Sequence, residues 1–199
     1  MSSIDFYWEP GSPYTYLAAT QIGALRALLE AGIVPDLVLG TSIGAINGAL
    51  IAGNPMSNRL ERLKRFWQLI HYEWPLQTTR AFPFVGQATA DLLTMALGNP
   101  EFFVPNPMAA ISPQLQLGPE EAAYYSVKPL AKTLDDLIEA DEFGRWPTRL
   151  TVGAAKVTTS EMVYFDSATI PLGIEHVLAS GALPPAFPAV RIDGEIYWD

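Results

Sequence analysis

Apolar and polar residues alternate along the first quarter of the chain in a pattern that predicts two strands, each followed by a helix. Residues 4–8 predict a short strand, and residues 37–39 predict a second strand that is apolar throughout. A Ser-Pro pair and apolar residues at helical spacing indicate a helix over 12–32, and another helix is expected over about 43–52. Strands and helices joined by short loops are typical of a parallel sheet covered by helices.

The rest of the pattern predicts three more helices and two β-hairpins. Apolar residues at helical spacing indicate helices over about 57–72, 129–140 and 174–180. Alternating residues around turn signals indicate hairpins of 149–157 with 162–165, and of 190–192 with 195–198. The second hairpin turns at Asp193-Gly194, a strong turn dipeptide.

Residues 75–119 are rich in proline and aromatic residues, and they predict irregular structure around a helix near 87–97. This segment is either a lid or a lining for an acyl chain, or it packs its apolar side chains onto the core. The side chains in question are Phe82, Phe84, Leu92, Leu93, Met95, Phe102, Phe103, Met108 and Ile111.

Length and charge narrow the class of protein. A single domain over 1–199 is expected, because 199 residues can bury a substantial core. The net charge of -9 excludes binding to nucleic acid, which needs lysine and arginine to replace phosphate counterions. The same charge disfavours electrostatic docking on anionic membranes, but transient apolar contact with a membrane surface stays open.

Composition also limits the chemistry. The chain has no cysteine, so disulfides, zinc–thiolate sites and thiol catalysis are excluded. Two isolated histidines and scattered acids show no ligand spacing, so neither a metal nor a cofactor is expected. The first residues lack a secretory signal, and the apolar run 43–53 is too short to span a bilayer, so a cytoplasmic location is expected.

The strongest chemical motif is Gly40-Thr41-Ser42-Ile43-Gly44, a G-x-S-x-G sequence between an apolar strand and a helix. This setting places a serine on a sharp turn with its hydroxyl exposed, and Gly40 and Gly44 are expected to relieve crowding in that turn. The N–H of Ile43 and the helix dipole would stabilise negative charge on a substrate oxygen. The alternative is a serine that only caps the helix.

The base that would activate Ser42 is less clear from the residues alone. His71 closes one predicted helix and His176 lies in the helix before Gly181. Either could complete a Ser-His-Asp arrangement, although neither has a supporting motif around it.

Several segments resemble patatin-like phospholipases. The resemblance covers about Gln21 to Asp199 and is specific, because well-separated motifs occur in the expected order. The matching segments are 21–33, the elbow 40–44, the small-residue run 45–49, Ala179-Ser180-Gly181-Ala182-Leu183-Pro184-Pro185-Ala186-Phe187-Pro188-Ala189, and the ending 192–199.

The resemblance implies a three-layer α/β/α fold with a mostly parallel central sheet, and a Ser–Asp dyad without histidine. Ser42 matches the family nucleophile and Asp199 matches the aspartate of its Asp-Gly-Gly or Asp-Gly-Ala motif. The implied reaction is hydrolysis of a lipid or carboxyl ester through an acyl-enzyme. An aspartate of ordinary pKa is a weak base, so the site must be dry or must align the carboxylate closely.

Two departures from the family pattern are visible. Where the family has a glycine-rich oxyanion loop, residues 8–13 contain two prolines and an acid, so only the N–H groups of Gly11 and Ser12 could substitute. The family also continues beyond the position of Asp199, so a domain truncated at its C-terminus is expected.

The first twenty residues resemble a different family, the glutathione-dependent 2-hydroxychromene-2-carboxylate isomerases of the thioredoxin-like fold. In that family the serine that matches Ser12 activates the glutathione thiol. Two alternatives to a hydrolase therefore remain from the sequence: a catalytically impaired or non-catalytic patatin-like scaffold, and an isomerase-like protein that uses Ser12.

Overall fold

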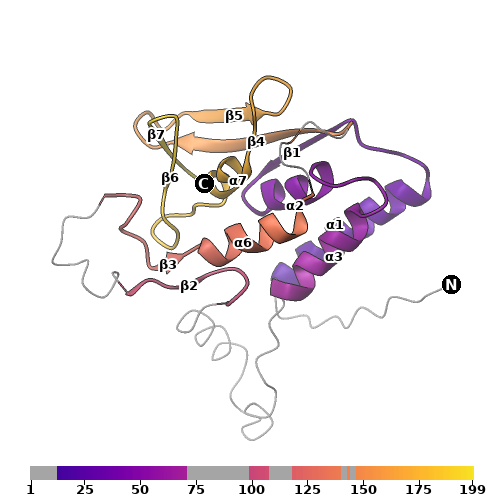
Figure 1. The fold of residues 1–199 in the computed structure, drawn as a ribbon, viewed down its shortest axis with the longest axis horizontal. Helices are drawn as coiled ribbons and strands as arrows, with labels where there is room; N and C mark the ends of the chain where they lie inside the picture. The colour runs from indigo at the N-terminus through magenta and orange to yellow at the C-terminus, as the bar shows by residue number, and fades with distance from the viewer. Residues whose placement is uncertain (1–12, 71–98, 108–117, 140–142, 144–146) are drawn as a thin grey trace, which may run out of the picture.

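A computed structural model describes residues 13–70, 99–107, 118–139, 143 and 147–199, which form a sheet with helices packed against it (Figure 1). The helices are α1 (Pro13–Glu30), α2 (Ile43–Ala52), α3 (Arg59–Ile70), α6 (Lys128–Leu137) and α7 (Ile174–Ser180). The main sheet contains β1 (Leu37–Thr41), β4 (Arg149–Lys156), β5 (Met162–Asp166), β6 (Val190–Ile192) and β7 (Glu195–Trp198). A separate pair consists of β2 (Val104–Pro105) and β3 (Tyr125–Ser126).

The elements predicted from the described residues are found with small differences at their ends. Helix α1 begins at Pro13, where the missing N–H of proline costs no helical hydrogen bond. Helix α6 ends at Leu137 rather than near residue 140. Both hairpins are present, and the second turns at Asp193 and Gly194 with φ of 49° and 85°. The predicted strand 4–8 and the helix near 87–97 lie outside the described residues.

The main sheet is mixed, so the expectation of a mostly parallel sheet is wrong for the described strands. Only β1 and β4 pair in parallel, whereas β5 and β7 both run antiparallel to β4, and β6 runs antiparallel to β7. The physical reason is the pair of hairpins, because strands joined by a tight turn must run in opposite directions.

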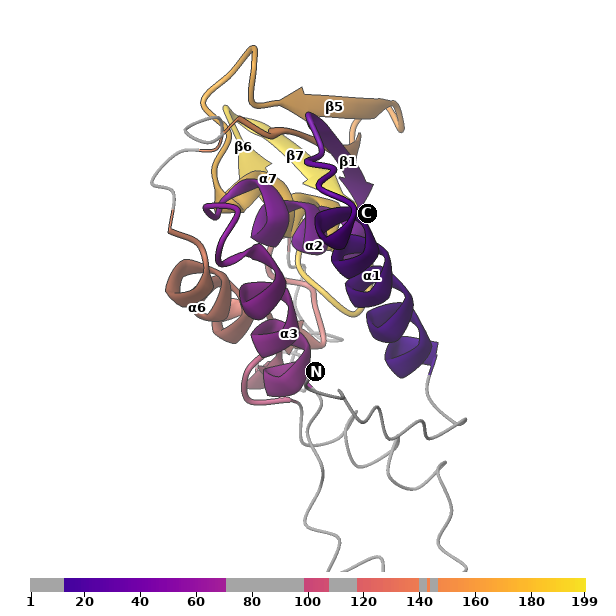
Figure 2. The same ribbon diagram turned by 90° about the vertical axis from the view of Figure 1, so that its right-hand side faces the viewer.

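One face of the sheet is covered by helices. Helices α2 and α7 pack against it, and α3 and α6 lie on the same side (Figure 2). The core between them is apolar, and its most deeply buried members include Ile46, Leu50, Leu63, Phe66, Leu134, Leu150, Val152 and Val177. Burial of these side chains is the main stabilising contribution, at about 25 cal/mol per Å² of apolar surface.

The opposite face of the sheet is open in the part of the chain that the structure describes. Leu37 and Leu39 of β1 are 50% and 61% exposed, and Tyr164 and Met162 of β5 are 59% and 47% exposed. Pairing across β4 places these four side chains on one face, since each lies opposite an odd-numbered residue of that strand. The second helical layer of the expected three-layer fold is not among the described residues.

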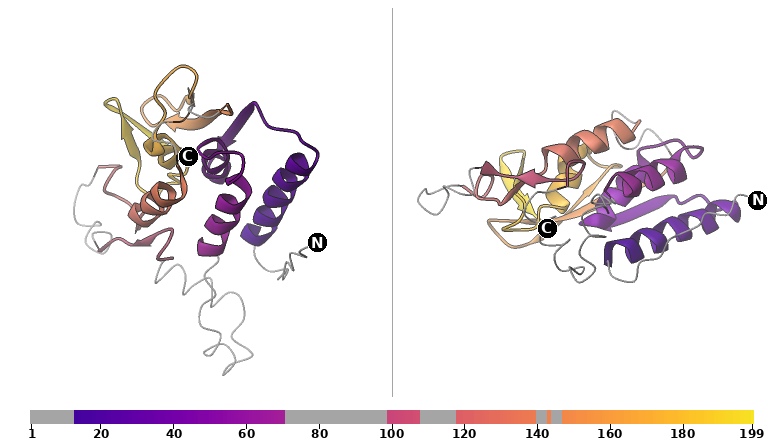
Figure 3. Two further views of the ribbon diagram at one scale, coloured as in Figure 1. Left: turned by 45° about the vertical axis from the view of Figure 1, so that its right-hand side comes forward. Right: turned by 90° about the horizontal axis from the view of Figure 1, so that it is seen from below.

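A buried asparagine joins three of the helices. The Asn47 side chain of α2 donates a hydrogen bond to Gln21 of α1 and accepts one at 3.1 Å from the indole Nε1 of Trp67 in α3. Helix α1 therefore lies beside α3, as Figure 3 shows, with Ile22 and Leu25 in the core. The contact fixes α2, whose first turn forms the candidate site.

Glycines set the turn from β1 into α2. A Cβ added to Gly40 would lie 2.2 Å from the carbonyl oxygen of Gly44, so the predicted need for glycine at position 40 is confirmed. The same prediction for Gly44 is wrong, because a Cβ there would meet nothing within 4 Å. A Cβ on Gly48 would lie 3.0 Å from Leu150, so Gly48 allows the helix to approach the sheet closely.

The Gly40→Ala and Gly44→Ala variants test this turn as a matched pair. We expect Gly40→Ala to unfold more easily by at least about 2 kcal/mol, since the new methyl group meets backbone that cannot move aside cheaply. Gly44→Ala should be neutral or stabilising by up to about 1 kcal/mol, because alanine is the better helix former. Urea denaturation measures both. Equal losses in the two variants would contradict the turn geometry.

A half-buried carboxylate joins β4 to β5. Asp166 accepts two hydrogen bonds from the Arg149 guanidinium, one of them from Nε at 2.6 Å. It also accepts hydrogen bonds from the hydroxyl of Thr151 and the backbone N–H of Ala168, both at 2.9 Å. These contacts, with Arg149 the largest, hold the pKa of Asp166 well below its ordinary value.

The lowered pKa predicts a pH-dependent contribution to stability. Because the folded state favours the charged carboxylate, the stabilisation is complete above the ordinary pKa of 3.8 and is lost as the pH falls below it. Asp166→Asn should therefore have a lower urea midpoint than the wild type near pH 7, and the gap should shrink towards pH 3. Asp136→Asn, which breaks an exposed pair with Lys132, is the control and should change little at either pH. A gap that does not vary with pH would contradict the role of Asp166.

Candidate active site

Ser42 lies at the point where β1 ends and α2 begins. Its backbone has φ of 55° and ψ of -129°, a conformation that residues with a side chain rarely adopt. Strain of this kind, of order 1–3 kcal/mol, persists only where the surrounding structure imposes it. The G-x-S-x-G segment thus forms the sharp strand-to-helix turn that the sequence predicts, and the structure shows in addition that this turn is strained.

The Ser42 side chain does not cap its helix. The carbonyl of Ser42 accepts hydrogen bonds from the N–H groups of Ala45 and Ile46, but its hydroxyl makes no capping bond. Within the described chain this hydroxyl has no hydrogen-bond partner at all. The alternative reading of Ser42 as a capping serine is therefore wrong, and the half-buried hydroxyl is available for other chemistry.

The first turn of α2 offers N–H groups to an anion. Within the described chain, the N–H of Ile43 and that of Gly44 have no acceptor, as expected for the first residues of a helix. Both lie where the helix dipole favours negative charge. The other two predicted oxyanion donors, Gly11 and Ser12, lie outside the described residues.

A second serine fixes the turn. Ser180, the last residue of α7, is completely buried, and its hydroxyl accepts a hydrogen bond of 2.9 Å from the backbone N–H of Ser42. The same hydroxyl donates a hydrogen bond of 2.6 Å to the carbonyl of Gly153 in β4. Sequence reasoning placed Ser180 inside a matching segment but gave it no role. The only available signal was a serine among small residues just before Gly181.

Asp199 lies immediately after β7, near the part of β4 that Ser180 contacts. Trp198 pairs with Ala155, and the backbone N–H of Asp199 donates a hydrogen bond of 3.1 Å to the carbonyl of Ala182. Ala182 is two residues beyond Ser180. The backbones of Ser42 and Asp199 are thus both bound by residues 180–182, at the end of α7.

The register of β4 shows why these residues meet. Gly153 pairs with Thr41 of β1 on one edge and with Tyr164 of β5 on the other. Ala155 pairs with Met162 of β5, so β7 must occupy the same edge as β1. Strand β1 runs parallel to β4 and β7 runs antiparallel, so their last residues approach each other along this edge.

The gap between the two strand ends is short. Thr41, the last residue of β1, lies opposite Gly153, and Trp198, the last residue of β7, lies opposite Ala155. Only one residue of β4 lies between these two positions. Two residues of a strand span about 7 Å. Ser42 and Asp199 are the next residues after each end, and the structure therefore brings their backbones to one place.

The side chains of Ser42 and Asp199 do not contact each other through a hydrogen bond in the described chain. Catalytic hydrogen bonds are often long in ligand-free proteins and shorten when substrate binds. Both residues are half-buried, so both can reach a ligand at the surface.

His176 is not part of this site as the structure describes it. His176 is buried, its ring packs edge-on against Phe165 with centroids 4.7 Å apart, and its Nδ1 accepts the N–H of Gly173 at 3.0 Å. These contacts belong to the start of α7, whereas Ser42 contacts its end. His71 lies outside the described residues.

Two aromatic residues of the 75–119 segment are described, and both pack. Phe102 and Phe103 contact Phe187 at ring distances of 6.1 and 5.7 Å, and Phe103 lies 4.7 Å from Tyr125. Packing is therefore the observed role of these two residues. The others in the predicted set lie outside the described residues.

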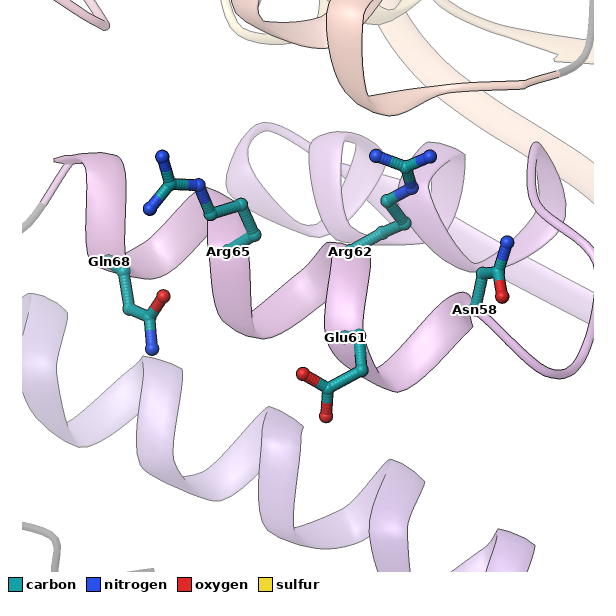
Figure 4. Close-up of a pocket in the computed structure, with 5 residues that line it drawn as sticks. All are labelled: Asn58, Glu61, Arg62, Arg65 and Gln68. Atoms are coloured by element: carbon teal, nitrogen blue, oxygen red, sulfur yellow. The ribbon is translucent and has the colours of Figure 1, made fainter.

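Surface hollows lie elsewhere on the molecule. One is a polar depression on α3, lined by Asn58, Glu61, Arg62, Arg65 and Gln68. Figure 4 shows that its two arginines point away from Glu61 and Gln68. None of these residues comes from the segments around Ser42 or Asp199, so this depression is separate from the candidate site.

The described residues contain neither a metal-binding cluster nor a membrane-spanning helix. No group of three or more histidine or acidic side chains there could hold a metal ion. None of the described helices combines the length and the apolar character needed to cross a bilayer.

Comparison with known proteins identifies relatives of this chain. The chain is 40% identical over 73 residues to "Lysophospholipase nte1" of Aspergillus terreus. The aligned segment covers 35% of this chain and 5% of that protein. It is 48% identical over 48 residues to "Patatin-like phospholipase domain-containing protein 6" of Homo sapiens and of Mus musculus. This aligned segment covers 24% of this chain and 4% of each relative. The matches thus span a small fraction of these relatives.

The family comparison covers far more of the chain. The model of the family described as "Patatin-like phospholipase" matches residues 16–199, which include Ser42, Ser180 and Asp199. The chain therefore belongs to the patatin-like phospholipase family.

Proposed function

We propose that this protein is a serine acyl hydrolase that cleaves lipid or carboxyl esters with Ser42 as nucleophile and Asp199 as base. The observation that carries the proposal is the Ser42 hydroxyl, which is held on a strained turn without a hydrogen-bond partner in the described chain. Strain is tolerated at functional sites because it fixes a reactive group in position. Family membership supports the same class of reaction.

The proposed reaction proceeds in two halves. Ser42 Oγ attacks the ester carbonyl carbon while its proton passes to the Asp199 carboxylate. The carbonyl oxygen becomes negative beside the N–H of Ile43, and the leaving alcohol then takes the proton from Asp199. In the second half, water attacks the acyl-enzyme carbonyl and Asp199 accepts a proton from that water. The bond to Ser42 Oγ then breaks, Asp199 returns the proton to Oγ, and the fatty acid leaves.

In the proposed reaction, the position of the Asp199 carboxylate follows from backbone hydrogen bonds that anchor both residues. Asp199 is anchored through its own N–H to Ala182, and Ser42 is anchored through its N–H to Ser180. Two anchored reactants lose little entropy on reaching the transition state, which can contribute several kcal/mol to catalysis. An acyl chain covering the half-buried pair would also exclude water and raise the basicity of the carboxylate.

A lipid is the proposed substrate class. The relatives carry the names lysophospholipase and patatin-like phospholipase, and we extend these names to this chain only as a proposal. The net charge of -9 favours apolar, transient contact with a membrane surface over electrostatic docking. A cytoplasmic location remains part of the proposal.

The proposal includes the second helical layer that the family resemblance implies. Its contact surface would be the open face of the sheet, where four apolar side chains are about half exposed. Exposed apolar patches of this kind commonly mark a surface that another element covers. The four residues are Leu37, Leu39, Met162 and Tyr164.

The alternative function is a non-catalytic scaffold that keeps the patatin-like fold. It would explain the absence of a hydrogen bond between Ser42 and Asp199, but it leaves the strained Ser42 turn without a reason. The isomerase alternative depends on Ser12, which lies outside the described residues. Saturable glutathione binding without esterase activity would favour that alternative.

A fluorophosphonate probe tests the nucleophile directly. We expect the probe to label Ser42, and mass spectrometry should locate the adduct on the peptide that contains it. Ser42→Ala should abolish labelling and reduce hydrolysis of short-chain esters by at least about 10³-fold, since no other group replaces the attacking oxygen.

The matched control for this test is Ser160→Ala. Ser160 is also a serine with positive φ, at 58°, but it lies on the exposed turn between β4 and β5. Its loss should leave labelling and hydrolysis unchanged. Labelling that persists in Ser42→Ala would remove Ser42 from the proposed role, and a folded wild type that is inert in both assays would favour the scaffold.

A further inference from the structure

The end of α7 contacts both halves of the proposed pair. The Ser180 hydroxyl accepts the N–H of Ser42 at 2.9 Å, and the carbonyl of Ala182 accepts the N–H of Asp199 at 3.1 Å. Only two peptide units separate the two contacts along the chain. The relative position of Ser42 and Asp199 therefore depends on this one short segment.

We propose that Ser180 is a positioning residue for the reaction, and that its hydroxyl sets the direction in which the Ser42 side chain points toward Asp199. The inference rests on the proposed function, because it takes Ser42 to be the nucleophile. Ser180 itself touches neither the substrate nor the reacting atoms in this scheme. It acts through the backbone of Ser42.

The contacts of the Ser180 hydroxyl explain how it can do this. A hydroxyl has one proton to donate and lone pairs to accept with, and Ser180 uses both functions. It donates to the carbonyl of Gly153 at 2.6 Å, which fixes the direction of its O–H bond, and it then accepts from Ser42. The N–H of Ser42 is thereby tied to β4, the strand along which both β1 and β7 end.

The geometry of Ser42 makes this tie important. The residue has φ of 55°, which an ordinary serine would relax if its N–H were released. Rotation about N–Cα moves Cβ and therefore displaces Oγ relative to Asp199. Misplacement of a reacting group by about 1 Å can cost about 10²-fold in rate.

Burial makes the effect specific to the hydroxyl. Ser180 is 0% exposed, so bulk water does not replace its oxygen without a rearrangement. Alanine at this position would leave the N–H of Ser42 and the carbonyl of Gly153 without their observed partner. Threonine would keep the hydroxyl and add one methyl group.

A matched control is available at the other end of the same strands. Thr148 is also fully buried, and its hydroxyl donates a hydrogen bond of 2.7 Å to the carbonyl of Pro35. Thr148 comes just before β4, next to the first residue of β1. Ser180 contacts Gly153 of β4, which lies opposite the last residue of β1. Thr148→Val removes a buried hydrogen bond of similar kind without touching the turn at Ser42.

The experiment compares Ser180→Ala, Ser180→Thr and Thr148→Val with the wild type under conditions where all are folded. For a short-chain ester, Ser180→Ala should lower kcat about 10–100-fold with KM nearly unchanged, since the loss is in alignment and not in binding. Ser180→Thr should recover most of that loss. Thr148→Val should lower the urea midpoint but keep kcat close to the wild-type value.

Amide hydrogen exchange at Ser42 gives a readout that does not depend on activity. The Ser42 N–H should exchange faster in Ser180→Ala than in the wild type, and it should be unaffected in Thr148→Val. Unchanged exchange at Ser42 in Ser180→Ala would overturn the inference, as would an equal loss of kcat in Ser180→Ala and Thr148→Val.

The two proposals fail in different ways. An active wild type whose Ser180→Ala variant keeps full kcat refutes the role of Ser180 and leaves the hydrolase proposal standing. A wild type that neither hydrolyses esters nor reacts with a fluorophosphonate refutes the hydrolase proposal, and the role of Ser180 in catalysis is refuted with it.

Discussion

The candidate site depends on the way one edge of β4 is shared. Strand β1 pairs with this edge in parallel and β7 pairs with it antiparallel. The last residues of the two strands pair with Gly153 and Ala155 of β4, which are separated by one residue. Backbone hydrogen bonds between strands fix register to within one residue, because a slip would reverse the faces of all the side chains. Residues 42 and 199, which are far apart in sequence, are brought together by this pairing and not by direct contact of their side chains.

The helical layer supports that edge from one side. Gly48 lets α2 lie against Leu150, Asn47 joins α2 to α1 and α3, and Ser180 binds the first turn of α2 to the strand. The strain at Ser42, which is small beside the burial of the core, is maintained by these contacts together. The hydrogen bonds of Asn47 and Ser180 fix the geometry of the site more than they stabilise the fold, since a buried hydrogen bond contributes only about 1 kcal/mol net.

Local features of the site could be predicted from the sequence, whereas its long-range features could not. The sharp turn at Ser42, the need for Gly40 and the hairpin at Asp193-Gly194 follow from residue types and short spacings, and the structure has them. The role of Ser180 has no local signature, because a buried serine near a helix end occurs for many reasons. Equally, no pattern in residues 149–156 indicates that two strands share one edge. The expectation of a mostly parallel sheet comes from the alternation of strands and helices at the start of the chain and from the family resemblance. The expectation about Gly44 was wrong because motif spacing does not reveal which glycine faces open space.

The most direct test of the site is whether Ser42 and Asp199 act as one unit, which a double-mutant cycle measures. The rate of fluorophosphonate labelling or ester hydrolysis is compared in the wild type, Ser42→Ala, Asp199→Asn and the double variant, with Asp193→Asn in the neighbouring turn as the control for the isosteric change. If the shared edge of β4 delivers a nucleophile and its base, Asp199→Asn should lower the rate by at least about 10²-fold, and the double variant should be no slower than Ser42→Ala. Independent, additive losses, or an Asp199→Asn variant as active as Asp193→Asn, would contradict the pairing of these two residues.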